Sequence, residues 1–97
     1  GYAIVGVAVQ LQVRDGALAS VRVGMTGLGP MPMRLAGVES ALAGTAASTA
    51  AIAAAAARAG DGLSFDDDVR GSAAYKLNIA RVYVRRALVR AMAASAG

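Results

Sequence analysis

The sequence contains no cysteine, no histidine and no tryptophan. Without cysteine, the chain cannot form a disulfide, hold an iron–sulfur cluster or build a cysteine metal site. Without histidine, it also lacks a principal zinc ligand and the usual general acid–base residue. We therefore expect no catalytic residue and no metal site in these 97 residues.

Large apolar side chains are scarce as well. The chain has one Phe and three Tyr, and 25 of its 97 residues are Ala, which buries little area per side chain. The core is therefore modest, and we expect marginal stability for the domain alone. The longest apolar run, residues 50–57, is too short to span a membrane, and no charged-then-apolar leader opens the sequence. The expected location is the cytoplasm.

The basic charge raises nucleic acid as a partner, because the net charge is +4 and the pI is near 10.4. Five of the ten basic residues lie at varied angles on the last expected helix, and aromatic residues that could stack on bases are nearly absent. A basic nucleic-acid-binding domain is therefore the weakest alternative, and we expect no nucleic-acid partner.

Two alternating segments at the start of the chain predict a β-hairpin. Apolar residues occupy every odd position of residues 3–13 and of residues 17–25. A three-residue loop at 14–16 keeps all odd positions on one face, because it pairs Val9 with Val21. Gly16 then takes the left-handed conformation that such loops need.

Helical patterns dominate the rest of the sequence. Residues 35–43 read as a short helix closed by Gly44, and Thr45 is placed to cap a second helix that runs to Arg58. A short third strand is expected near Met33. Ser72 caps a long uninterrupted helix over residues 72–96. The order predicts an α+β fold: a small antiparallel sheet of two to four strands, then three helices packed on one face.

The long helix carries two apolar stripes. One broad stripe has the ordinary core-facing pattern, and it comprises Ala73, Leu77, Ala80, Val84, Ala87, Leu88 and Ala91. The other recurs every seven residues on nearly the opposite side, and it comprises Tyr75, Ile79, Val82 and Val89. Neighbouring helices of the same domain could cover this second stripe, but we interpret it as an interface with protein outside these residues.

Acidic and glycine-rich segments could imitate ligand sites. Asp66, Asp67 and Asp68 directly precede the long helix, where carboxylates stabilise the positive helix end, so they do not indicate a metal or acid–base site. Gly27 and Gly29 lie in a glycine-rich loop, but the spacing is not that of a dinucleotide-binding loop and prolines follow it. They are weak candidates for a contact with a cofactor.

The motifs at residues 24–34 and 66–88 carry a family resemblance. The second, DDVRGSAAYKLNIARVYVRRAL, resembles the end of the FAD-carrying (medium) subunit of the molybdenum hydroxylases, which include aerobic carbon monoxide dehydrogenase and xanthine dehydrogenase. Lys76 stands where that family usually has Arg. In the first, Gly27, Pro30, Pro32 and Arg34 fit the family's G-G-V-x-P-T-P-x-R pattern, which leads from a strand into a helix.

The resemblance implies that residues 1–97 are a single domain, the C-terminal fragment of a longer flavin subunit. It also implies an oxidoreductase in which that subunit binds FAD through its other domains and relays electrons from iron–sulfur clusters. The expected partners are those FAD-binding domains and the molybdenum and iron–sulfur subunits, and we expect no cofactor in the fragment itself.

A different class of protein is the main alternative. The chain could be a freestanding α+β interaction module that dimerises through the second stripe of the long helix. The family resemblance argues against this alternative, as does a sequence that opens within a strand.

Overall fold

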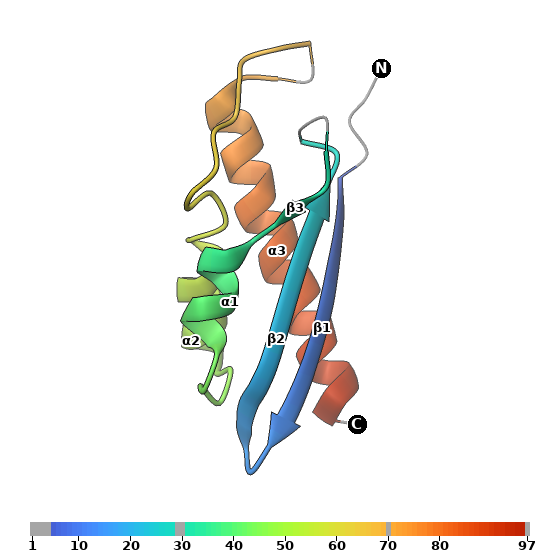
Figure 1. Cartoon of the computed structure of the whole chain (residues 1–97), viewed down its shortest axis with the longest axis vertical. Helices are drawn as coiled ribbons and strands as arrows, with labels where there is room; N and C mark the ends of the chain where they lie inside the picture. The colour runs from blue at the N-terminus through green and yellow to red at the C-terminus, as the bar shows by residue number, and fades with distance from the viewer. Residues whose placement is uncertain (1–4, 29–30, 70, 97) are drawn as a thin grey trace.

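The computed structural model describes residues 5–28, 31–69 and 71–96. Its elements follow in the order β1 (Gly6–Arg14), β2 (Ala17–Thr26), β3 (Met33–Arg34), α1 (Ala36–Leu42), α2 (Thr49–Ala56) and α3 (Ala73–Ala96) (Figure 1). The strands form one antiparallel sheet in the order β1-β2-β3. The predicted α+β fold, including the short third strand at Met33, is confirmed.

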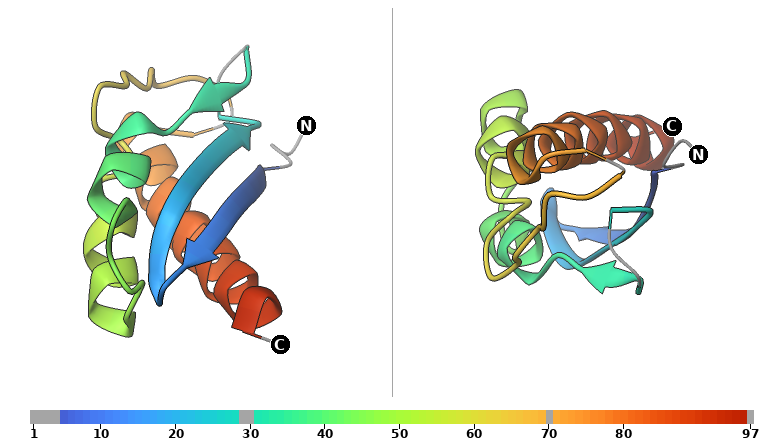
Figure 2. Two further views of the ribbon diagram at one scale, coloured as in Figure 1. Left: turned by 60° about the horizontal axis from the view of Figure 1, so that its bottom comes forward. Right: turned by 90° about the horizontal axis from the view of Figure 1, so that it is seen from above.

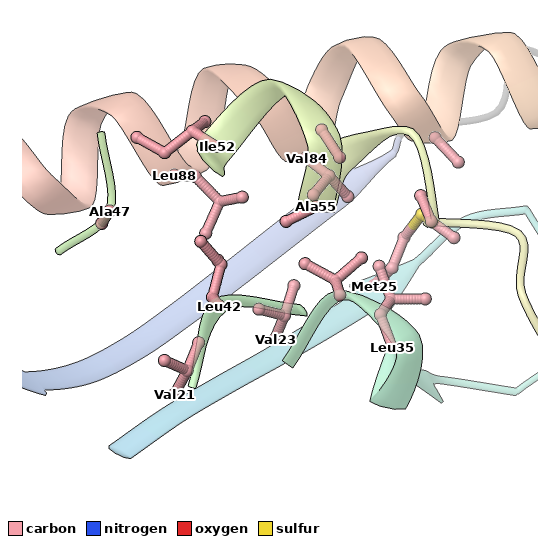
Figure 3. Packing of buried hydrophobic residues seen from close by; sticks show 14 of the residues in the cluster. Val21, Val23, Met25, Leu35, Leu42, Ala47, Ile52, Ala55, Val84 and Leu88 are labelled. Atoms are coloured by element: carbon pink, nitrogen blue, oxygen red, sulfur yellow. The ribbon is translucent and has the colours of Figure 1, made fainter. Parts of the chain in front are cut away.

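The helices cover one side of the sheet. The long helix α3 packs against β1 and α2, while α1 packs against β2 and α2. Figure 2 shows α3 crossing the sheet, with α1 and α2 beside it along the β2 side. Between these layers lies the core, and Figure 3 shows side chains of β2, the helices and the adjoining loops meeting there. Its most buried large members include Val23, Met25, Leu35, Leu42, Val84 and Leu88.

The hairpin register differs from the predicted one. Asp15 and Gly16 form a two-residue turn with φ values of 54° and 77°, the positive pair that a type I′ hairpin turn requires. Val9 pairs with Val23. The predicted three-residue loop and the pairing of Val9 with Val21 are therefore wrong, whereas the positive φ of Gly16 is confirmed.

A β-bulge explains why odd positions of β1 still pair with odd positions of β2 along most of the hairpin. Val13 pairs with Leu18 but Gln12 pairs with Ser20, so Ala19 is an extra residue on β2. The insertion restores odd-to-odd pairing beyond the turn, and it lets both Leu18 and Val21 face the core at 2 % and 9 % exposure. Loop length and a bulge are two ways of satisfying the same apolar pattern.

The edge of β2 beyond the short strand β3 is covered by α1 and the segment that follows it. The N–H of Val23 donates to Oε2 of Glu39 at 2.8 Å, and the N–H of Leu35 donates to the Val23 carbonyl at 2.9 Å. Further along, Leu18 exchanges backbone hydrogen bonds with the 44–45 segment. The edge of the sheet at β2 is therefore closed by hydrogen bonds.

The first helix follows the sequence prediction, with Val38 and Leu42 buried in the core. The second does not begin where we expected. Ser48, not Thr45, caps α2, because its Oγ accepts a hydrogen bond from the N–H of Ala51 at 3.1 Å. Thr45 instead donates its hydroxyl to the Leu42 carbonyl at 2.8 Å, and its own carbonyl accepts from the Leu18 N–H. These bonds hold Thr45 against the end of α1 and the start of β2. Ser48 caps the helix instead, and α2 begins at Thr49.

No helix in the described part of the chain is long and apolar enough to cross a membrane.

Candidate docking site

The start of α3 is held by the acidic loop before it. Oγ of Ser72 accepts a hydrogen bond from the N–H of Tyr75 at 3.1 Å, which confirms Ser72 as the cap. Oδ1 of Asp67 accepts from the N–H of Ala73 at 2.6 Å. Within the described residues, no group of three or more acidic side chains is arranged to hold a metal ion. The acidic run therefore serves the helix end, where its charge is favourable.

A buried lysine, to which the sequence assigned no role beyond its place in the family motif, completes this arrangement. Lys76 is 1 % exposed. Its Nζ donates to the Asp66 carbonyl and lies 2.9 Å from Oδ1 of Asp68. The lysine thus ties the acidic loop down onto the first turn of α3. Three carboxylates shortly before a lone lysine were the signal in the sequence that could have suggested the pair.

The second stripe of α3 is largely open to solvent. We call Tyr75, Ile79, Val82 and Val89 the docking face. Tyr75 is 55 % exposed, Val89 51 % and Val82 36 %, whereas Ile79 is half-buried against the core. Exposed large apolar side chains that recur along one helix are typical of a surface that contacts another protein.

The arginines of α3 are not explained by the helix dipole. The helix continues to Ala96 and its last turn contains no basic residue. Because the dipole acts mainly within the last turn, Arg85, Arg86 and Arg90 lie outside its reach. The helix dipole therefore does not account for these three charges. No described carboxylate is within ion-pair distance of these three side chains.

A groove opens between β1 and α3. It has a volume of 260 Å³ and is lined by Val5, Val7, Tyr83, Arg86 and Arg90. We call it the β1 groove. The guanidinium of Arg86 lies over the Tyr83 ring, 5.8 Å from its centroid. Tyr83 was not among the residues predicted from the sequence, although its spacing of three from Arg86 places the two on one side of the helix.

Of the two weak candidates for a cofactor contact, only Gly27 lies within the described residues. Gly27 has a φ of 100°, which suits a tight turn. Gly29, the other weak candidate, lies outside the described residues.

Comparison with known proteins identifies the family. The chain matches the family model of the CO dehydrogenase flavoprotein C-terminal domain over residues 1–91. None of the curated proteins compared with the chain matches it significantly.

Several solved structures share the fold. Reconstituted CO dehydrogenase from Oligotropha carboxidovorans contains a chain with 32% sequence identity and a TM-score of 0.78, covering 92% of this chain and 31% of that one. The structure of a CO dehydrogenase from Hydrogenophaga pseudoflava that lacks the Mo-pyranopterin moiety of the molybdenum cofactor contains a chain with 35% sequence identity and a TM-score of 0.80. The match covers 92% of this chain and 31% of that one. Quinoline 2-oxidoreductase from Pseudomonas putida 86, at 22% identity and a TM-score of 0.78 over 89% of this chain and 30% of that one, shows a likeness of fold alone.

Fold and matches together define a C-terminal domain of a flavoprotein subunit. The chain belongs to the CO dehydrogenase flavoprotein C-terminal domain family, and the resemblance predicted from its motifs is confirmed. It spans 31% of the CO dehydrogenase chains that it matches.

Proposed function

We propose that residues 1–97 are a single domain, the structural and docking end of a longer flavin subunit. The subunit binds FAD through its other domains and relays electrons from iron–sulfur clusters toward an acceptor, in a cytoplasmic molybdenum hydroxylase complex. The observation that carries the proposal is the family match over residues 1–91 in a chain about one third as long as its relatives.

The surface of the domain supports a docking role. The described residues include no group of three or more acidic side chains that could hold a metal ion. What they offer instead is the docking face along α3 and, next to it, arginines without carboxylate partners. A domain of this kind contributes contacts, and the chemistry belongs to the cofactors bound elsewhere in the complex.

The test changes the docking face within the whole subunit. The full reading frame is expressed with its partner subunits, once as the natural sequence and once with Val82→Asp and Val89→Asp. A charge placed in a buried interface disfavours association. We expect the double variant to elute apart from the partner subunits or to lose FAD, measured by size-exclusion chromatography and by flavin absorbance.

A matched control uses Ala54→Asp, because Ala54 is exposed on α2. This variant should assemble and hold FAD normally. Full assembly and full flavin content of the Val82→Asp, Val89→Asp subunit would contradict the docking role. The reading frame upstream of Gly1 gives an independent check, since it should encode domains with glycine-rich FAD-binding motifs.

A further inference from the structure

One edge of the sheet is closed by hydrogen bonds, and the other edge is open. The β2 side is sealed by β3, by the carboxylate of Glu39 and by the backbone of Leu35 and of the 44–45 segment. On the outer edge of β1, the described residues place no strand and no hydrogen-bonding side chain. An open strand edge presents a row of backbone donors and acceptors that can pair with another chain.

Burial along the two long strands shows the same asymmetry. The core-facing residues of β2, Val21, Val23 and Met25, are at most 9 % exposed. Their pairing partners on β1 are only half-buried, and they are Leu11, Val9 and Val7. Val5, which directly precedes β1, is half-buried as well. Apolar side chains that face the helix layer are thus left partly uncovered where the sheet stops at β1.

The helix α3 extends over this open side. Its C-terminal half passes behind β1 and emerges beyond it (Figures 1 and 2). The β1 groove lies between the two elements, with valines on the sheet side and Tyr83, Arg86 and Arg90 on the helix side. An added strand on β1 would therefore pass beneath two guanidinium groups.

We propose that the β1 groove binds an acidic extended segment of another polypeptide as a fourth strand of the sheet. Its backbone pairs with the outer edge of β1, and its inward apolar side chains cover Val5 and Val7. Its carboxylates meet Arg86 and Arg90, since planar guanidinium groups bind carboxylates well. The inference deepens the docking role proposed above and rests on it.

Charge selects this occupant over two others. β1 contains no Asp or Glu and ends at Arg14, and α3 also has no acidic residue. A second copy of the chain would bring its own arginines against those of the first, which is repulsive. A nucleic acid would place phosphates against valines, and the groove offers one tyrosine for stacking.

The test captures the occupant in the assembled protein. The whole subunit is produced with its complex, with p-azidophenylalanine at position 83, where the ring of Tyr83 already borders the groove. After illumination, mass spectrometry identifies the crosslinked peptide. We expect one segment with at least two carboxylates, and no such crosslink from a control with the same photo-reactive residue at position 10, on the opposite face of β1.

Charge reversal then tests the recognition itself. Arg86→Glu with Arg90→Glu should lower the crosslink yield at least about tenfold, because like charges across an interface repel each other. Changing the carboxylates of the captured segment to Lys in the same protein should restore the yield. If the charge-reversed subunit does not fold, Arg86→Gln with Arg90→Gln replaces it, and the expected yield is again reduced.

Several results would overturn the proposal. One is a crosslink only within this domain, to a second copy of the chain or to nucleic acid. Another is a captured segment without carboxylates, and a third is a crosslink yield that charge reversal does not change. A failure here is distinguishable from failure of the docking role. If Val82→Asp with Val89→Asp separates the subunits while position 83 captures nothing, the docking role stands and the fourth strand does not.

Discussion

At the scale of single residues, Lys76 couples the acidic loop to the longest helix. The side chain is 1 % exposed, and its ammonium group contacts the backbone carbonyl of Asp66 and the carboxylate of Asp68. A buried ammonium group is tolerated because it is paired and hydrogen-bonded. The Asp68–Lys76 contact therefore fixes the path of the chain into α3.

Replacing this lysine should destabilise the domain. Lys76→Met keeps an apolar stem of similar length but leaves the Asp66 carbonyl and Asp68 without their cation. We expect a loss of about 2–3 kcal/mol in the free energy of unfolding, the range for hydrogen bonds to charged groups. Urea denaturation followed by circular dichroism measures it.

Arg85→Met serves as the matched control, because Arg85 is an exposed cation of the same helix. Its effect should stay within about 0.5 kcal/mol. Equal stability of the Lys76→Met and natural proteins would show that the buried contact contributes nothing net.

Glu39 should make stability depend on pH. Burial raises the pKa of Glu39, but the hydrogen bond from Arg34, the Val23 N–H, and the charges of Arg34 and Arg22 outweigh burial, so the pKa lies below its ordinary value. A carboxyl whose folded-state pKa is lowered stabilises the protein above its unfolded-state pKa, about 4.3. That contribution is lost as the pH falls through the folded-state value.

Glu39→Gln should therefore lower the free energy of unfolding by about 1 kcal/mol at pH 7. The difference from the natural protein should shrink toward zero below about pH 4, where the carboxyl becomes protonated. Arg34→Gln should keep the bond to Val23 and weaken the pH dependence. A Glu39→Gln deficit that stays constant between pH 7 and pH 3 would contradict this account.

At the scale of elements, α3 has one buried and one exposed apolar stripe. Substitutions of Val84 in the buried stripe and of Val82 in the exposed one compare their contributions to stability. Val84 is fully buried, whereas Val82 on the docking face is 36 % exposed. Val82→Asp should cost less than about 1 kcal/mol in the isolated chain, whereas Val84→Asp should cost more than about 3 kcal/mol, because it buries an unpaired charge.

Thermal and urea unfolding of both variants measure the difference. The interface interpretation fails if Val82→Asp destabilises the isolated chain as strongly as Val84→Asp. Such a result would mean that the docking face is already part of the core.

Element types were predictable from the sequence because periodicity reports directly on burial. The alternation of β1 and β2, the position of β3 and the Ser72 cap all follow from local patterns. The bulge at Ala19 was not predictable, since a changed loop length satisfies the same pattern. Thr45 misled the prediction because its hydrogen bonds go to Leu42 and Leu18, which only the tertiary fold brings close.

The candidate site was predictable only in part, for a related reason. Heptad spacing revealed Tyr75, Val82 and Val89, because spacing along a helix translates into a shared face. The β1 groove needs β1 and α3, some 80 residues apart in sequence, to be placed side by side. No local pattern carries that information, and the burial of Lys76 likewise depends on how the acidic loop folds back.

At the scale of the whole molecule, charge and exposure are distributed unevenly. Glu39 and Asp61 pair with Arg34 and Arg58 on the side of α1 and α2. Arg86 and Arg90 form no ion pair with a described carboxylate, and they lie on α3 beside the open edge of β1. A domain that folds alone and acts alone gains nothing from leaving apolar and cationic groups together on one side. The arrangement fits a piece that is completed by its neighbours in a larger subunit.

The last prediction concerns the cofactor of that subunit. The chain on its own should not bind FAD, because its glycine-rich loop lacks the dinucleotide spacing and it has only one Phe, three Tyr and no Trp that could stack on the flavin ring. Tyr75 and Tyr83 lie on α3, and Phe65 is half-buried against the core. The purified chain should be colourless, and micromolar protein should not quench the fluorescence of added FAD. The complete subunit, measured in parallel, should carry flavin absorbance. Stoichiometric titration of FAD by the 97-residue chain would place the cofactor at the loop around Gly27 and would contradict its assignment to the other domains.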